Sequence, residues 1–201
     1  MSIENCEKLS MLSLMSGSIN RMSHVYRYSS VPTIRKENVA EHSWYVAYYS
    51  FVIGLDLVRR GCEIDFGKLL SRALVHDLDE SMTGDFLRHV KYGHPRLKSV
   101  LDEVSIAMLE SMEKELHIPI KEPWTNAKSR EDLEGDIVAI ADLARVLSYV
   151  YEEIQLGNNH VKYILKECCK YLRDTIKERR PTVANDYARD LIKWVEEVAN
   201  D

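Results

Sequence analysis

The sequence predicts an all-α protein, folded as a single-domain helical bundle of about six to eight helices. Apolar residues recur at helical spacing along most of the chain, and no alternating stretch typical of a strand is bounded by turn residues. Only 8 glycines and 5 prolines interrupt the 201 residues. Because no linker or repeat divides the sequence, we expect residues 1–201 to form a single domain.

Capping and breaking residues set the expected order of the helices. Asn38 and Asp65 are typical N-caps, and Gly61 ends the helix that Asn38 begins. Pro119 and Pro123 indicate a loop that continues to residue 130. The expected helices cover residues 4–17, 19–28, 38–60, 66–79, 96–116, 131–156, 160–179 and 182–199, with a loop of short turns at 80–95.

The composition disfavours several classes of function. A net charge of -5 provides no basic surface for nucleic acid, whereas 45% hydrophobic residues are enough for a buried core. Residues 1–20 lack the basic and apolar regions of a signal peptide, and no apolar run is long enough to span a membrane. The four cysteines form no CxxC pair, so we expect reduced thiols. These features predict a cytoplasmic protein, in the host cytoplasm if a phage encodes it, without a nucleic-acid or membrane partner.

Four polar side chains occupy positions where their helices should be apolar. His42 falls on the apolar row of its helix, and Asp142 falls on the apolar row of a late helix. Asp77 is the next inward position after the stripe that ends at Leu74, and His76 lies beside it. Since buried carboxylates without a partner are costly, we expect these side chains to share a cation.

A divalent transition metal is the cation that this donor set favours. Two imidazoles and two carboxylates suit Mn, Co, Fe or Zn better than Ca or Mg. His76 and Asp77 point in different directions on a regular helix, so we expect a helix end there that lets both reach one ion. A lone inward histidine is more often a core residue, and only the ordered set of four favours a metal site.

The order His42, then His76-Asp77, then Asp142 resembles the H…HD…D pattern of HD-domain phosphohydrolases. The surrounding motifs resemble more specifically the bacterial HD-domain 5′-deoxynucleotidases, which hydrolyse deoxynucleoside 5′-monophosphates to deoxynucleosides and phosphate. The likeness extends from Ile19 to Asn159. It rests on Ile19-Asn20-Arg21, the run from Arg35 to Ser43, His76-Asp77 with Glu80 and Thr83-Gly84-Asp85, Val90-Lys91-Tyr92, and Glu152-Glu153 followed by Gly157-Asn158-Asn159.

The resemblance implies roles for further residues. It implies that the four predicted ligands hold one ion, with positions left for water and a phosphate oxygen. It assigns Glu80, one helical turn after Asp77, to orienting or deprotonating the attacking water. It places Asp85 on the 3′-hydroxyl side of the sugar and as a proton donor to the leaving oxygen. Arg27 and, more weakly, Lys91 are implied to contact the phosphate.

Tyr28 departs from the pattern of the resembled family. The Arg-Trp pair of that family is Arg27-Tyr28 here. The tryptophan packs close to the sugar and helps to exclude a 2′-hydroxyl, so Tyr28 is a predicted substrate contact that leaves the deoxy-over-ribo preference open.

Three functions remain open at this point. The first is hydrolysis of deoxynucleoside monophosphates, and the second is a dNTP triphosphohydrolase, like the phage enzymes that cleave dATP and release tripolyphosphate. The third is an HD module that binds nucleotide without turnover, which the presence of all four ligands and Glu80 disfavours. A cyclic-nucleotide phosphodiesterase is disfavoured because ligands for a second metal are not evident.

The sequence also predicts self-association. Tyr149 and Tyr151 lie on a helix with two apolar faces, a pattern that can mark subunit contacts. The resembled enzymes are homodimers and related phage enzymes form larger rings, so we expect a homodimer or a larger homo-oligomer that acts on the nucleotide pool.

Overall fold

A computed structural model describes residues 9–86, 88–178 and 182–198. Within these residues the regular structure is helical. The described residues form no β-sheet, and Tyr26 and Asn38 form an isolated β-bridge. The all-α prediction is confirmed. The α-helices are α1 (Met11–Ser16), α2 (Val39–Arg59), α3 (Phe66–Val75), α4 (Glu80–Thr83), α5 (Arg88–Gly93), α6 (Pro95–Leu116), α7 (Lys121–Ser129), α8 (Leu133–Gln155), α9 (Lys162–Glu178) and α10 (Asn185–Val198), with 3₁₀ turns at η2 (Ser18–His24) and η3 (Asn159–Val161).

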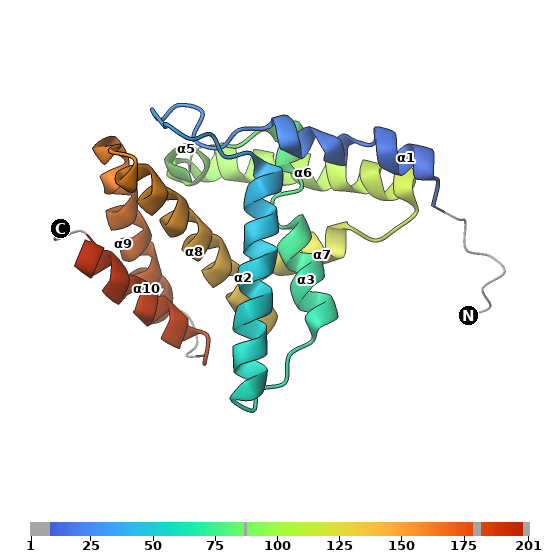
Figure 1. The fold of residues 1–201 in the computed structure, drawn as a ribbon. Coiled ribbons are helices and arrows are strands. Elements are labelled where there is room, and N and C mark those ends of the chain that lie inside the picture. Colours follow the sequence, from blue (N-terminus) through green and yellow to red (C-terminus); the bar gives the residue numbers. More distant parts are fainter. Residues whose placement is uncertain (1–8, 87, 179–181, 199–201) are drawn as a thin grey trace.

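Two long helices, α2 and α8, pack together at the centre of the bundle (Figure 1). On one side α3 packs against both of them and against α7, and on the other side α9 and α10 pack as a pair. Helix α6 runs across the end of the bundle at which α2 begins, with α1 beside it. None of the described helices is both long and apolar enough to span a bilayer.

The predicted caps begin and end the central helices. The Asn38 side chain accepts a hydrogen bond from the Glu41 amide at 2.9 Å, and the Asp65 side chain accepts one from the Lys68 amide at 3.1 Å. Gly61 follows the end of α2 with φ of +88°, a conformation that glycine adopts without strain. The predicted boundaries of α2 and the start of α3 are therefore confirmed.

The helix expected over residues 66–79 ends earlier, at Val75. Three amides within residues 78–81 donate to carbonyls three residues back, so the chain tightens into turns before α4 begins. The buried carboxylate of Asp79 fixes these turns, because it accepts hydrogen bonds from Ser105 Oγ at 2.8 Å and from Trp124 Nε1 at 2.9 Å. The helix end that was expected near His76 is thus present, anchored from α6 and α7.

Other expectations were wrong in detail. The loop predicted through residue 130 contains α7, in which Pro123 lies in the first turn, where no backbone N–H is needed by the helix. The loop at 80–95 contains α4 and α5, and the helix expected at 19–28 is a 3₁₀ turn that ends at His24, followed by the bridge residue Tyr26 and a turn at 27–30. The helix expected over residues 4–17 is shorter: α1 begins at Met11, after its N-cap Ser10, and residues 4–8 lie outside the described part. Cys62, Cys168 and Cys169 are free thiols, as expected, and Cys6 lies outside the described residues.

Tyr149 does not lie on the surface. It is 1% exposed, its ring stacks on Tyr28 with centroids 5.1 Å apart, and its hydroxyl donates to the Arg35 carbonyl. Tyr151 is half-buried and packs edge-on against Trp194. The expectation that Tyr149 marks a subunit contact is therefore wrong, because its aromatic surface is used inside its own chain.

A buried ion pair joins α8 to the segment that precedes α2. The side chains of Arg145 and Glu37 are both 0% exposed, with Arg145 Nε 2.6 Å from Glu37 Oε1. The guanidinium also lies 4.0 Å from the ring centroid of Tyr45 and 3.2 Å from a carboxylate oxygen of Glu152. The pair therefore holds the segment carrying Arg27 and Tyr28 against the bundle.

We expect Arg145→Met to lower the free energy of unfolding by about 3 kcal/mol, because it leaves the Glu37 carboxylate buried without its cation. Urea denaturation followed by circular dichroism measures the change. The matched control is Arg59→Met at an arginine whose side chain is 80% exposed, which should shift stability by less than about 0.5 kcal/mol. Equal losses in the two variants would contradict the role given to the pair.

Candidate active site

Two imidazoles from different helices face each other in the interior. His42 lies on the buried face of α2, and His76 lies at the C-terminal end of α3. Their Nε2 atoms are 3.4 Å apart. Nδ1 of His76 is 2.8 Å from the Ala73 carbonyl, to which it donates, so Nε2 carries the lone pair when this imidazole is neutral. That lone pair faces the other imidazole, an arrangement that a shared cation would stabilise.

Two carboxylates complete this cluster. Asp142 Oδ1 lies 3.0 Å from His42 Nε2, and Asp77 Oδ2 lies 3.2 Å from His76 Nε2. One ligand atom each from His42, His76 and Asp142 lie within 4.8 Å of one another. Asp142 Oδ1 is buried, yet it makes no hydrogen bond of good geometry with any described residue. The donor set and this orphaned oxygen fit a divalent transition metal.

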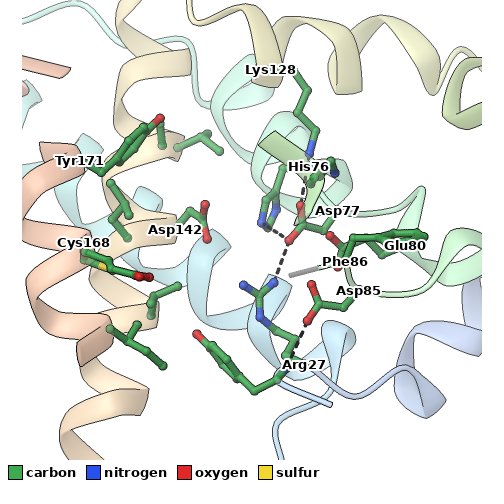
Figure 2. A pocket seen from close by; sticks show the side chains of 18 of the residues that line it. Arg27, His76, Asp77, Glu80, Asp85, Phe86, Lys128, Asp142, Cys168 and Tyr171 are labelled. Atoms are coloured by element: carbon green, nitrogen blue, oxygen red, sulfur yellow. Dashed lines mark hydrogen bonds and ion pairs between the residues drawn. The ribbon is translucent and has the colours of Figure 1, made fainter. Parts of the chain in front are cut away.

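Asp77 turns toward two cations (Figure 2). Its Oδ2 accepts a hydrogen bond from Arg27 Nη1 at 3.0 Å, and its Oδ1 accepts one from Lys128 Nζ at 3.2 Å. Burial alone would raise the pKa of Asp77, but the charges of His76 and Lys128 hold it well below its usual value. Asp77 is therefore a charged carboxylate that draws two cations to one end of the site.

The protonation states of His42 and Asp142 suit metal binding, whereas burial would lower the pKa of His76 but the charge of Asp77 raises it. Burial, helped by the charge of Arg27, lowers the pKa of His42 to about 4, so this imidazole is neutral at pH 7. Burial alone would raise the pKa of Asp142, but the neighbouring His42 brings it down to about 2. A neutral imidazole and an ionised carboxylate are the forms that bind a metal ion.

The cluster opens into a cavity of about 630 Å³, within the usual size of a small-molecule site. One end is polar and the other is apolar, formed by α8 and α9. Figure 2 shows Cys168 and Tyr171 of α9 across the cavity from Asp77, Glu80 and Asp85. The polar end is lined by Arg27, His76, Asp77, Glu80, Asp85, Lys91, Lys128 and Asp142, and the apolar end includes Val31, Val138, Leu143, Val146, Ile164 and Cys168.

Glu80 and Asp85 line the polar end, as expected from the motif. Glu80 is 6% exposed, and burial together with the charge of Asp77 raises its pKa well above the usual value. Burial also raises the pKa of Asp85, against the charge of Arg27, and its carboxylate accepts a hydrogen bond from the Tyr28 amide at 3.2 Å. Carboxyl groups with raised pKa values can exchange protons near neutral pH, as general acids and bases must.

Tyr28 also lines the cavity. Its φ of +57° is unusual for a residue with a side chain, and its amide and ring are both held, by Asp85 and Tyr149. Its hydroxyl is buried and has no hydrogen-bond partner among the described residues. The structure therefore places all the predicted substrate contacts, Lys91 included, on one cavity.

The sequence missed two contributors to this site. Lys128 belongs to α7, a helix that was expected to be a loop, and an isolated lysine carries no signal of its own. Glu37 was noted only as part of a motif, yet its Oε2 lies 3.8 Å from both His42 Nδ1 and Arg27 Nε. Glu37 could have been identified from the sequence by its position inside a family motif, directly before the N-cap Asn38.

Comparisons with known proteins agree with this geometry. A 5′-deoxynucleotidase of Vibrio vulnificus is 27% identical over 171 residues, which cover 83% of this chain and 86% of the relative. An HD-domain phosphohydrolase from Listeria innocua has a similar fold, with a TM-score of 0.68 and 23% identity over 94% of this chain and 98% of its own. The cyanophage S-2L HD phosphohydrolase DatZ, solved with dA and one catalytic Zn²⁺ ion, gives a TM-score of 0.61 and 19% identity, covering 91% of this chain and 95% of its own.

The family assignment rests on the sequence rather than on these folds alone. A family model described as 5′-deoxynucleotidase YfbR-like matches residues 15–193, a span that contains the whole histidine and aspartate cluster and every residue named above as lining the cavity. This chain therefore belongs to the YfbR-like 5′-deoxynucleotidase family.

Proposed function

We propose that this protein is a metal-dependent phosphohydrolase that converts deoxynucleoside 5′-monophosphates to deoxynucleosides and phosphate. The observation that carries the proposal is the cluster of His42, His76 and Asp142, with Asp77 beside both imidazoles, at the cationic end of a nucleotide-sized cavity. The family match and relatives named 5′-deoxynucleotidase support the same reaction. A monophosphate is proposed rather than a dNTP because those relatives are named 5′-deoxynucleotidases.

We propose His42, His76, Asp77 and Asp142 as the ligands of one divalent ion. Zn, Co, Mn or Fe suits these donors. An ion held there would supply Lewis-acid chemistry at the phosphate ester. DatZ, which shares the fold, was solved with one catalytic Zn²⁺, and this supports a single-ion site here.

The chain's own residues would bind and orient the substrate around that site. Arg27, Lys128 and Lys91 line the same end of the cavity and would bind the phosphate, with the guanidinium fork matching two of its oxygens. The base and sugar would extend toward the apolar wall of α8 and α9, which excludes water from them.

Two carboxyl groups would transfer the protons of the reaction, one from the attacking water and one to the leaving oxygen. Glu80 would orient the attacking water and accept its proton; its raised pKa, and its Oε2 without a hydrogen-bond partner among the described residues, support this role. Asp85 would face the sugar and donate a proton to the leaving oxygen. Tyr28, held by Asp85 and Tyr149, would contact the sugar. Its ring is smaller than the tryptophan of the family pattern, so comparing dNMPs with NMPs as substrates measures whether ribose is excluded.

We also propose that the protein self-associates as a homodimer or larger homo-oligomer, works in the cytoplasm and consumes precursors of the dNTP pool. We propose as well that residues 1–201 form a single domain. The exposed apolar residues of α2 support self-association.

Metal removal tests the proposed reaction directly. Protein stripped with chelator should be inactive, and single addition of Co, Mn or Zn should restore release of deoxynucleoside and phosphate from dNMPs, with about one ion bound per chain. Chromatography separates the products from dNMPs, NMPs and dNTPs. Asp77→Asn should lose activity, whereas Asp102→Asn at an outer position of α6 should keep it. Tripolyphosphate from a dNTP, without cleavage of any monophosphate, would contradict the proposal.

Substituting Glu80 separates proton transfer from metal binding. Glu80→Gln keeps the shape but cannot accept a proton, so kcat should fall roughly 100- to 10,000-fold while metal content stays unchanged. Steady-state kinetics and elemental analysis measure the two quantities. Glu63→Gln at an exposed position is the control. Near-normal kcat in Glu80→Gln would remove Glu80 from the mechanism.

Glu37→Gln tests whether the buried carboxylate positions His42. Carboxylates that hydrogen-bond a metal-bound histidine typically change metal affinity by roughly 10- to 100-fold. Because Glu37 Oε2 lies 3.8 Å from His42 Nδ1, beyond hydrogen-bond distance, we expect a loss near the lower end, about 10-fold. The matched control is Glu152→Gln, which also removes a charge beside Arg145 but lies on the surface side of it. Isothermal titration of the stripped protein with Zn²⁺ or Co²⁺ gives the affinities. The positioning role fails if both variants bind the ion as tightly as the unmodified chain.

A further inference from the structure

Among the described residues that line the cavity, α9 contributes one acidic side chain, Glu167. At about 100° per residue, the cavity-lining positions Ile164, Glu167, Cys168 and Tyr171 fall within an arc of about 100° on this helix. Figure 2 shows Cys168 and Tyr171 of this wall across the cavity from Asp77. Glu167 is therefore a carboxylate on the wall toward which the base would extend, opposite the end where the phosphate would bind.

Glu167 makes no hydrogen bond or ion pair with any other residue that the structure describes. Lys170 follows three residues later, at the spacing of an ordinary ion pair along a helix, yet it does not pair with Glu167. Glu167 is exposed and faces the cavity. Its oxygens can therefore accept hydrogen bonds from a ligand that fills the cavity.

The polarity of this wall changes within one helical turn. Tyr171 follows Glu167 by four residues, a rise of about 6 Å along the helix axis. Nη1 of Arg130 donates to the Tyr171 hydroxyl at 3.3 Å, and the Arg130 side chain is 8% exposed and also lines the cavity. A flat ligand lying against α9 would therefore meet an acceptor, Glu167, and a donor, Arg130, side by side.

Guanine is the base whose edge matches this order of acceptor and donor. Its N1–H and its 2-amino group are adjacent donors, which one carboxylate can accept together. Its O6 and N7 are adjacent acceptors, the pair that an arginine side chain commonly binds. Adenine and cytosine place a ring acceptor beside their single amino donor, and the N–H of thymine lies between two carbonyl oxygens, so each would bring a lone pair toward Glu167.

We propose that Glu167 selects guanine as the base of the substrate, by accepting hydrogen bonds from N1–H and the 2-amino group of deoxyguanosine 5′-monophosphate (dGMP). This inference rests on the proposed function and names the base of its substrate. Arg130 would lie on the O6 side of the same edge. Glu167 would touch only the base, so it determines which nucleotide binds and takes no part in breaking the phosphate ester.

A matched change in substrate and side chain tests the proposal. Deoxyinosine 5′-monophosphate (dIMP) lacks only the 2-amino group, so the unmodified chain should use it with kcat/KM roughly 10-fold below that for dGMP. Glu167→Ala should bring the ratio of the two values close to 1. The control is Asp174→Ala, on the same face of α9 two turns beyond Glu167 and outside the cavity lining, which should keep the ratio.

Equal use of dGMP and dIMP by the unmodified chain would overturn the proposal, and so would a preference that survives in Glu167→Ala. If no dNMP is hydrolysed, calorimetric titration of the unmodified chain with dGMP and dIMP decides the question without turnover. A tighter dGMP complex would then support the base assignment and refute only the proposed reaction. Equal binding of the two nucleotides, or no binding of either, would refute the base assignment as well.

Discussion

The rest of the site depends on the buried ion pair between Glu37 and Arg145. Glu37 Oε1 pairs with Arg145 of α8 at 2.6 Å, and Glu37 Oε2 faces both His42 of α2 and Arg27 at 3.8 Å. One carboxylate thus connects the central helix pair, an inward imidazole and the guanidinium at the polar end of the cavity. Since it is fully buried, Glu37 is stable there only while Arg145 compensates its charge.

The charges around Asp77 explain why the cationic end of the cavity lies beside the cluster of histidines and aspartates. An ionised carboxylate in the interior requires counter-charges, and Arg27 and Lys128 provide them through both oxygens. The same two cations line the cavity, where an anionic phosphate would meet them. Asp77 therefore gathers the groups that bind the substrate, in addition to its proposed role at the metal.

The sequence predicted the parts of this site that follow from helical periodicity. His42 and Asp142 were assigned inward because their neighbours at helical spacing are apolar, and the end of α3 near His76 followed from the need for two adjacent ligands to converge. Lys128 could not be found, because Pro123 suggests a loop unless its place in a first turn is known. The burial of Tyr149 was missed because its partner, Tyr28, comes from a segment whose path depends on tertiary contacts.

The two faces of α2 make different demands on one helix. The inner face must place His42 to within a fraction of an ångström, which requires the tight packing of Val46 and Leu57 against α3 and α8. The opposite face carries apolar residues that water solvates poorly: Trp44, Tyr48, Val52, Leu55 and Val58 are exposed, and Phe51 packs edge-on against Phe66 of α3. The position of His42 therefore depends on the buried face of α2, to which the opposite face adds the contact of Phe51 with α3.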